Sequence, residues 1–280
     1  MISKLVGAAL FVFFLGVRTL SVGAETRPSV SDFLGQVQAT YDKMQSYSSV
    51  GDITSDFSVP GTGRQESHYS FSIKLARPNL YRIEWDVHMP MMTLKGAAWS
   101  AGNENGNFVS VPGQTSPLHP KDMSTALSMA TGISGGAAST IPAIFFGMSN
   151  GKLKLKDAAF AQDADIEGDA CYVITKKTAP IGVTLWISKK SKLLRQIRND
   201  FSGPMKMPEM TDEEVRKAVE AMGQKPTSEA IQRMKAQMAT ARSMMSSGIT
   251  GFTIEIHRQI VVNASLSKAD FTPRPSPASK

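Results

Sequence analysis

A strict alternation of apolar and polar residues over positions 69–87 constrains the fold of this chain more than any other feature. The apolar positions hold Tyr69, Phe71, Ile73 and Leu75, then Tyr81, Ile83, Trp85 and Val87. Successive side chains of a strand point to opposite faces, so both segments have one apolar and one polar face. Antiparallel strands with one solvated face have this pattern. The sequence therefore predicts a strand pair joined at Arg77-Pro78-Asn79, whose apolar face needs a cover.

Further segments of strand character lie before and after this pair and are separated by turn residues. The expected strands lie at 48–57, 97–101, 107–111, 153–160, 170–178, 182–188, 193–201 and 251–262. Serial hairpins of this kind predict a mainly β (α+β) fold with one antiparallel sheet, strongly curved or closed into an incomplete barrel. In the last strand we expect Ile254 and Ile256 on the apolar face, opposite Glu255 and His257.

Helical segments accompany these strands. The range 31–44 predicts an amphipathic helix ahead of the first strand, with Ser31 as its N-cap. Asp122 can cap a short helix further on, and the range 140–146 begins like a helical turn with proline near its start. This second segment ends in three large apolar residues, Ile144, Phe145 and Phe146. A compact helical pair here is suited to cover the open side of a curved sheet.

A helical hairpin is expected as an insertion at 203–247. Thr211-Asp212-Glu213-Glu214 has the sequence of a capping box, and Pro226-Thr227 begins a second helix. The chain has 16 methionines, and many of them fall on the apolar stripe of this hairpin. Methionine is unbranched and polarisable, so the stripe suits packing against apolar partners of variable shape.

Copper binding is the alternative interpretation of these methionines. Soft thioethers bind Cu(I), and the run Met205, Met207 and Met210 is the one short enough to converge on one ion. The helical spacing of the others favours a packing surface. We therefore expect neither a metal site nor a cofactor.

The first 24 residues have the pattern of a signal peptide. Lys4 precedes an apolar run at 5–17, and Val22-Gly23-Ala24 forms a small-residue cleavage site. The apolar run is shorter than the ~20 residues that span a bilayer. We expect a soluble periplasmic protein with a single domain at 25–280, whose tail at 273–280 is disordered.

The polar residues do not predict catalysis. The four histidines, His68, His88, His119 and His257, lie on separate segments and fit no zinc or triad motif. We expect His68 and His257 to be solvated on polar strand faces. The acidic residues between 163 and 169 predict a solvated loop, because their spacing is not that of a calcium loop. The sequence therefore favours a protein that is not an enzyme.

The single cysteine and the charge exclude further classes of function. Cys171 lies in an expected strand and predicts a buried, unreactive thiol. The net charge of +7 is spread along the chain, with no basic helix or aromatic platform, so nucleic acid is not an expected partner. A monomer is expected.

Several short motifs resemble those of the LolA family of periplasmic lipoprotein carriers. Ala76-Arg77-Pro78-Asn79-Leu80-Tyr81 is similar to that family's Arg-Pro-Asn-Leu-Phe segment, and Ala269-Asp270-Phe271-Thr272-Pro273 is similar to its closing motif. The segments 106–112, 185–188 and 193–195 resemble other strands of the family. Two departures are the missing Asp of an Asp-Gly turn and the methionine-rich insertion. We therefore expect a relative with the same fold and not the carrier itself.

The resemblance implies a curved sheet whose apolar concavity is covered by helices and accepts acyl chains. It also implies that Arg77 helps to hold this cover shut. With the alternation described above, it gives these expected cavity-lining residues: Phe71, Ile73, Tyr81, Ile83, Trp85, Val87, Ile144, Phe145 and Phe146. The expected function is binding of a lipid or lipoprotein acyl group for transport or shielding, with a membrane-associated donor or acceptor protein as partner. A lipid-sensing regulatory module of the same fold is the second hypothesis, and copper handling is the third.

Overall fold

The computed structural model describes residues 27–272 except 90–91, 101, 103–105, 112–115, 149–152 and 154. The expected signal peptide and the expected disordered tail lie outside the described residues. Among the residues described, no helix is both long and apolar enough to cross a membrane.

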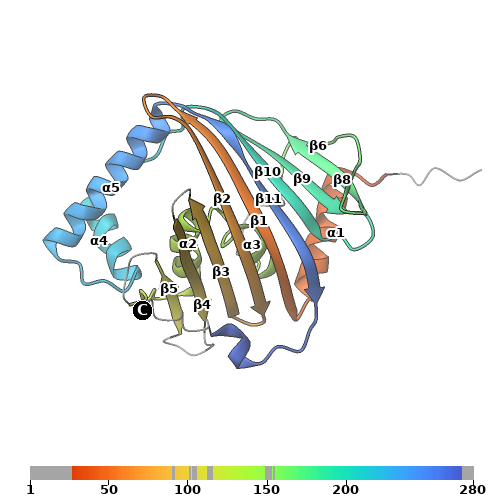
Figure 1. The fold of residues 1–280 in the computed structure, drawn as a ribbon, viewed down its shortest axis with the longest axis horizontal. Helices are drawn as coiled ribbons and strands as arrows, with labels where there is room; N and C mark the ends of the chain where they lie inside the picture. The colour runs from red at the N-terminus through yellow and green to blue at the C-terminus, as the bar shows by residue number, and fades with distance from the viewer. Residues whose placement is uncertain are drawn as a thin grey trace, which may run out of the picture.

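One antiparallel sheet of eleven strands forms the body of the molecule (Figure 1). Its strand order is β5-β4-β3-β2-β1-β11-β10-β9-β8-β6, and β7 pairs with β8 off this path. The strands are β1 (Ser46–Val59), β2 (Gly63–Ala76), β3 (Leu80–Met89), β4 (Met92–Ser100), β5 (Asn107–Ser110), β6 (Ala159–Phe160), β7 (Ala164–Ile166), β8 (Asp169–Lys176), β9 (Ile181–Ser188), β10 (Leu194–Gly203) and β11 (Ile249–Val262). The expected fold class, a curved antiparallel sheet that stays open, is confirmed.

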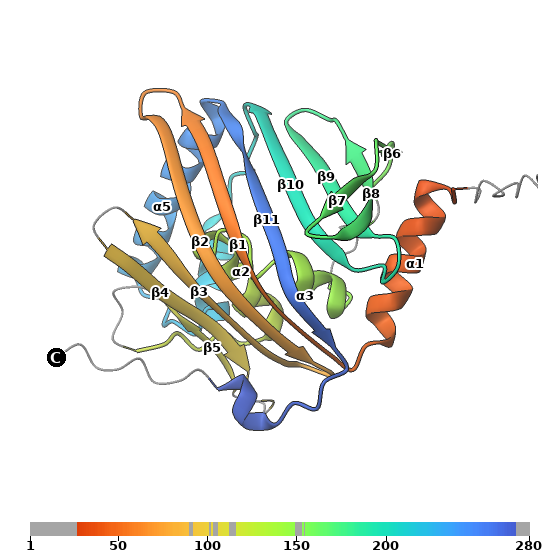
Figure 2. The same ribbon diagram turned by 45° about the vertical axis from the view of Figure 1, so that its right-hand side comes forward.

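The chain crosses from one edge of the sheet to the other between β5 and β6, and its first and last strands are neighbours. β11 pairs with β1 on one side and with β10 on the other, so the C-terminal strand lies at the centre of the sheet. The long central strands twist and curve around the helices, as Figure 2 shows. In β1 the odd-numbered residues from Tyr47 to Ser55 are buried, and the even-numbered residues between them are not. The core therefore lies on one side of the sheet, the concave side.

The helices fall into two groups. The helices of the concave side are α1 (Val30–Lys43), α2 (Met123–Ile133) and α3 (Thr140–Phe145), and those of the insertion between β10 and β11 are α4 (Asp212–Ala221) and α5 (Ser228–Ser246). The expected inserted hairpin is therefore confirmed. Its first helix begins with the predicted capping box of Thr211 and Glu214.

The predicted N-cap of the first helix was wrong by two residues. Ser29, and not Ser31, caps α1, because its hydroxyl oxygen accepts a hydrogen bond from the backbone N–H of Asp32 at 3.1 Å. The Ser29 hydroxyl also contacts the Asp32 carboxylate at 2.7 Å. An N-cap serine in this way provides an acceptor for a backbone N–H group of the first helical turn. An acidic residue in that turn is favourable because the N-terminus of a helix carries a partial positive charge.

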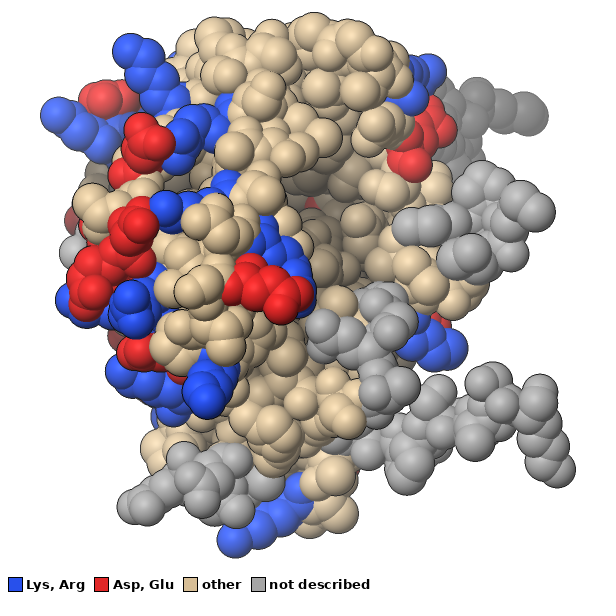
Figure 3. Space-filling model, turned by 90° about the vertical axis from the view of Figure 1, so that its left-hand side faces the viewer, with Lys and Arg blue, Asp and Glu red and all other residues tan. Residues whose placement is uncertain are grey.

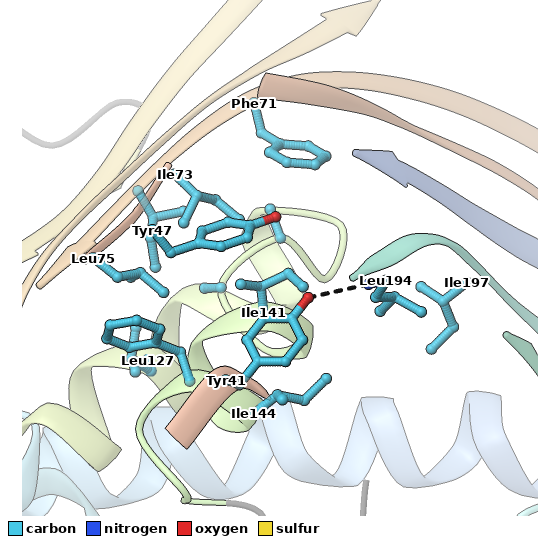
Figure 4. Close-up of a cluster of buried hydrophobic side chains, with 14 of the residues drawn as sticks. Tyr41, Tyr47, Phe71, Ile73, Leu75, Leu127, Ile141, Ile144, Leu194 and Ile197 are labelled. Atoms are coloured by element: carbon cyan, nitrogen blue, oxygen red, sulfur yellow. Dashed lines mark hydrogen bonds between the residues drawn. The ribbon is translucent and has the colours of Figure 1, made fainter. Parts of the chain in front are cut away.

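The core lies between the concave face and the helices α1, α2 and α3. Figure 4 shows how side chains from both halves of the sheet meet around Tyr41 of α1. The backbone N–H of Leu194 donates a hydrogen bond to the Tyr41 hydroxyl at 3.2 Å. Burial raises the pKa of Tyr41 above its ordinary range, despite this hydrogen bond. Tyr41 therefore joins α1 to β10 as a neutral group.

The region before β8 differs from the prediction. The range 153–160 was expected to be a strand, but its described residues form turns and only the two-residue β6 at its end. The acidic segment that was expected to be a loop contains β7, which pairs with the start of β8. Its acidic residues take part in ion pairs, among them Asp163 with Lys189 at 2.6 Å and Asp169 with Arg195 at 3.0 Å.

The C-terminal segment is attached to the outer side of β2 and β3 through a short 3₁₀ turn, η1 (Lys268–Phe271). The Asp270 carboxylate accepts hydrogen bonds from Lys74 at 2.7 Å and from the backbone N–H of Ser267 at 2.9 Å. The hydrogen bond from Lys74 contributes most to holding the pKa of Asp270 well below its ordinary value, and those from Ser267 add to the effect. Phe271 is fully buried beside them.

We expect Asp270→Asn to lower the free energy of unfolding near neutral pH and to have no such effect in acid. The folded-state pKa of Asp270 is depressed, so its contribution is present above the unfolded pKa of about 4 and is lost as the pH falls through the folded pKa. Urea unfolding of the variant and the wild type over this pH range measures the difference. Glu66→Gln, at an exposed ion pair, is the control. A difference that stays constant with pH would contradict this assignment.

Candidate ligand-binding cavity

A cavity of about 240 Å³ lies on the concave side between β9, β10, β11 and the segment that leads into α3. Most of its wall is aliphatic, and one end is polar. The aliphatic wall consists of Ile53, Ile144, Leu153, Leu155, Val183, Leu185, Leu194 and Ile197. The polar end consists of Ser139, Thr140, Asn199, Thr253 and Glu255, and Gly135 and Gly136 complete the lining.

Strand register brings the wall residues together. Val183 of β9 lies opposite Asn199 of β10, and Leu185 lies opposite Ile197. Across the next pair, Asn199 lies opposite Thr253 of β11. Residues at directly opposite positions of neighbouring strands share a face. The alternation in β9 and β10 therefore builds one continuous inner wall.

The nine residues predicted to line a cavity are all found on or beside the concave side. Eight of them belong to the packed core next to the cavity, and Ile144 lies on the cavity wall itself. Trp85, Ile83 and Tyr81 of β3 are at most 1% exposed. Their contact with a ligand stays a prediction.

The residues of β9 and β10 that form the wall were not among those predicted to line a cavity. Val183, Leu185 and Ile187 alternate with polar or outward residues, as the residues of β2 and β3 do. The strands themselves were predicted, so the period-two signal was available for them too. β9 and β10 are far from β2 and β3 in the sequence, so the sequence did not indicate that all four strands line the same concavity.

The face assignment of β11 was wrong. Glu255 and His257 point inward and are 4% and 0% exposed, whereas Ile254 and Ile256 lie on the convex side. The reason is the register, because Glu255 lies opposite Ile53 of β1 and Ile197 of β10, which are both inward. The expectation that His257 is solvated is therefore also wrong. Its ring packs edge-on against Phe71, with centroids 5.3 Å apart.

Arg77 joins the ends of two helices. Its guanidinium donates hydrogen bonds to the carbonyls of Met44 at 3.0 Å and Tyr41 at 3.3 Å, at the end of α1, and to that of Phe145 at 2.7 Å, at the end of α3. Its Cζ also lies 4.8 Å from the centre of the Phe145 ring. A positive group at the C-terminus of a helix is favourable because the last carbonyls lack partners in the helix.

The described part of the chain has neither a cluster of acidic, histidine and cysteine ligands nor a reactive thiol. No group of three or more His, Cys, Asp or Glu residues there could hold a metal ion. Cys171 is buried, as predicted, and burial raises the pKa of its thiol to about 11. A thiol with such a pKa is a poor nucleophile near neutral pH.

The methionines of the insertion are mostly half-buried. Met222, Met234 and Met238 have intermediate exposure, as do Met205, Met207 and Met210, and Met244 is 47% exposed. The small core of the hairpin is formed by Val215, Val219 and Ile231. Seen from the hairpin side, charged side chains gather along one part of the surface, and the surface next to them is hollowed (Figure 3).

Comparison with known proteins gives structural similarities only. No protein-family model matches the chain, and no curated protein matches its sequence. A DUF1329 family protein from Desulfovibrio piger is similar over 87% of this chain and 95% of its own chain. The sequence identity is 11% and the TM-score is 0.32. An outer membrane lipoprotein-sorting protein domain from Vibrio parahaemolyticus is similar over 85% of this chain and 94% of its own chain. The sequence identity is 7% and the TM-score is 0.32.

A LolA superfamily protein from Nitrosomonas europaea is also similar, over 88% of this chain and 99% of its own. Its identity is 9% and its TM-score is 0.30. Scores of this size indicate little shared detail.

Proposed function

We propose that this protein binds the acyl part of a lipid or lipoprotein in the cavity, without catalysing a reaction, and so shields it for transport. The observation that carries the proposal is the aliphatic wall, to which β9, β10 and α3 contribute Val183, Leu185, Ile197 and Ile144. Ligand pockets are mostly apolar and contain a few placed polar groups. This cavity has that composition.

The size of the cavity limits what it can hold in this conformation. Apolar cavities of ~150 Å³ hold a benzene molecule, and pockets for drug-sized ligands begin near ~300 Å³. A cavity of about 240 Å³ therefore accommodates a few methylene groups. Each methylene removed from water contributes ~0.8 kcal/mol. A longer acyl chain requires α3, which carries Ile144 on the cavity wall, to move away from the sheet and from α1.

Titration with an environment-sensitive fluorescent acyl probe tests the proposal. The full exported chain is expected to bind one probe per molecule, with a blue-shifted emission. Unlabelled dodecanol should displace the probe, because it competes for the same aliphatic wall. A folded protein that leaves the probe emission unchanged at all concentrations would contradict the proposal.

Arg77 is proposed to control how readily α1 and α3 open. Three carbonyls at the ends of these helices share its guanidinium, and no other residue type offers as many donors in a planar group. When the helices separate, these hydrogen bonds have to break. The hydrogen bonds of Arg77 thus favour the closed arrangement.

We expect Arg77→Leu to speed probe release about tenfold while the sheet stays folded. The change removes charge-assisted hydrogen bonds of ~1.5–3 kcal/mol each, of which part is regained from water when the carbonyls become exposed. Stopped-flow fluorescence measures release, and circular dichroism checks the fold. Arg64→Leu, at a largely exposed arginine on β2, is the matched control. Equal release rates for both variants would exclude Arg77 from gating.

A further inference from the structure

One part of the cavity lining is a segment of small residues, 134–140, which leads from α2 into α3. Its sequence is Ser-Gly-Gly-Ala-Ala-Ser-Thr, so no side chain in it is larger than that of threonine. Gly135, Gly136, Ser139 and Thr140 line the cavity. Small side chains bury little apolar area, so the hydrophobic effect contributes little to holding this segment on the sheet. Its polar contacts therefore carry more weight.

Thr140 ties this segment to the centre of the sheet. Its hydroxyl donates a hydrogen bond to Oε2 of Glu255 on β11 at 2.8 Å. Thr140 is the first residue of α3 and is 5% exposed, so water does not compete freely for this contact. A hydrogen bond to an ionised carboxylate is roughly twice as strong as one between neutral groups. The Ser134 hydroxyl, by contrast, donates to the carbonyl of Thr131 in α2.

The Glu255 carboxylate is held in place on the sheet side of this contact. Oε1 lies 3.0 Å from Nε2 of His257, at an orientation outside that of a hydrogen bond. Nδ1 of His257 lies 3.3 Å from the Ser49 hydroxyl on β1. Ser49, Glu255 and His257 are at most 4% exposed. Side chains packed in this way have little freedom to follow a moving partner, so the contact with Thr140 breaks when the segment lifts.

The other end of the segment has a backbone suited to a hinge. Gly135 and Gly136 have φ angles of +66° and +116°, which L side chains rarely adopt. Glycine has access to a wider range of backbone angles than other residues. Hinges are a few loop or element-terminal residues that absorb such changes. Rotation at these two glycines lifts residues 137–140 while α2, whose Leu127 and Ala130 are buried, stays in place.

We propose that residues 134–140 form the gate of the cavity and that the hydrogen bond from Thr140 to Glu255 is its latch. This inference rests on the proposed function, because the gate admits and releases the acyl ligand. Lifting the gate moves the N-terminus of α3, which Thr140 holds. Arg77 holds the other end of α3, at the carbonyl of Phe145. Polar contacts therefore hold α3 at both ends, and the one at Thr140 lies on the cavity wall itself.

Thr140→Val tests the latch, because valine keeps the shape of threonine and lacks its hydroxyl. The latch is present whether the cavity is empty or filled. Its loss should therefore raise the rate constants of probe binding and probe release together, each about tenfold, and should change the dissociation constant by less than about twofold. Stopped-flow fluorescence with the acyl probe gives both rate constants.

Two further threonine variants are matched to this test. Thr140→Ser restores the hydroxyl and should return both rate constants toward the wild-type values. Thr240→Val makes the same change as Thr140→Val at an exposed position of α5 and should leave both unchanged. Faster release without faster binding in Thr140→Val would overturn the inference, because Thr140 would then be a wall contact only. Wild-type rate constants in that variant would also overturn it.

Glu255→Gln decides the question if Thr140→Val does not fold. This variant keeps the shape of the side chain and removes its charge, so the hydrogen bond from Thr140 becomes weaker. Both rate constants should rise by about threefold, since a neutral acceptor forms a hydrogen bond roughly half as strong. Wild-type rate constants in folded Glu255→Gln would contradict the latch.

Hydrogen exchange of the free protein tests the latch without a ligand and so separates it from the proposed function. In Thr140→Val the amides of residues 134–140 should exchange about tenfold faster, while those of α2 keep their wild-type rates. Unchanged exchange, or an equal acceleration in α2, would overturn the latch. If residues 134–140 respond as expected but the wild type does not bind the probe, the proposed function fails and the latch on α3 is supported.

Discussion

Val183→Trp is expected to abolish binding of the acyl probe, with a loss of affinity of about 100-fold or more. Val183 is half-buried on the cavity wall, and an indole at this position fills the space that the ligand needs. Excluding about four methylene groups removes ~3 kcal/mol of binding free energy. The enlarged side chain enters a void and not a packed region, so the fold should tolerate it better than overpacking elsewhere in the core.

The matched control for this prediction is Val261→Trp. It makes the same change near the end of β11, where the valine is 49% exposed and lies away from the cavity wall. Fluorescence titration should give wild-type affinity for the control. If folded Val183→Trp binds the probe as the wild type does, acyl ligands do not use this cavity.

Gly51→Ala is expected to have the largest effect on stability, a loss of about 3 kcal/mol. A Cβ atom at position 51 would collide with the backbone carbonyl oxygen of Ile256 on β11 and with the ring of Phe71 on β2. The ring can turn aside, but the carbonyl belongs to the central strand pair and cannot move without shifting β11. Glycine here lets the Phe71 and His257 rings pack together over the backbone.

Gly35→Ala is the control with the opposite expected sign. Gly35 lies within α1, and a Cβ atom there would meet nothing within 4 Å. Alanine favours a helix over glycine by about 1 kcal/mol, so this variant should be slightly more stable than the wild type. Urea unfolding of both variants measures the two effects. If Gly51→Ala unfolds at the wild-type urea concentration, the close approach of β1 and β11 is not as described.

The sequence predicted those parts of the structure that a local residue pattern determines by itself. The alternation in β2 and β3 is unambiguous, because polar residues occupy every second position between large apolar ones. The capping box before α4 is equally local, since Thr211 and Glu214 satisfy each other's backbone. Such features do not depend on which strand lies next to them.

The polar end of the cavity could not be predicted because it depends on pairing across the whole chain. In β11 apolar and polar residues alternate along the strand, and the large apolar residues Ile254 and Ile256 indicated the wrong face as the inward one. The correct face is set by β1 and β10, which are far away in sequence. The contact of Thr140 with Glu255 joins residues 115 positions apart. No local pattern identifies such a partner.

The most direct test of acyl binding in the cavity is a crystal structure of the protein with a fatty alcohol that carries bromine on its tail. Anomalous scattering locates the bromine independently of the protein chain. We expect a bromine site among Ile144, Val183 and Ile197. A bromine site in the more open groove of about 720 Å³ between α1 and residues 155–158 would contradict it, and so would a cavity that stays unchanged at saturating ligand.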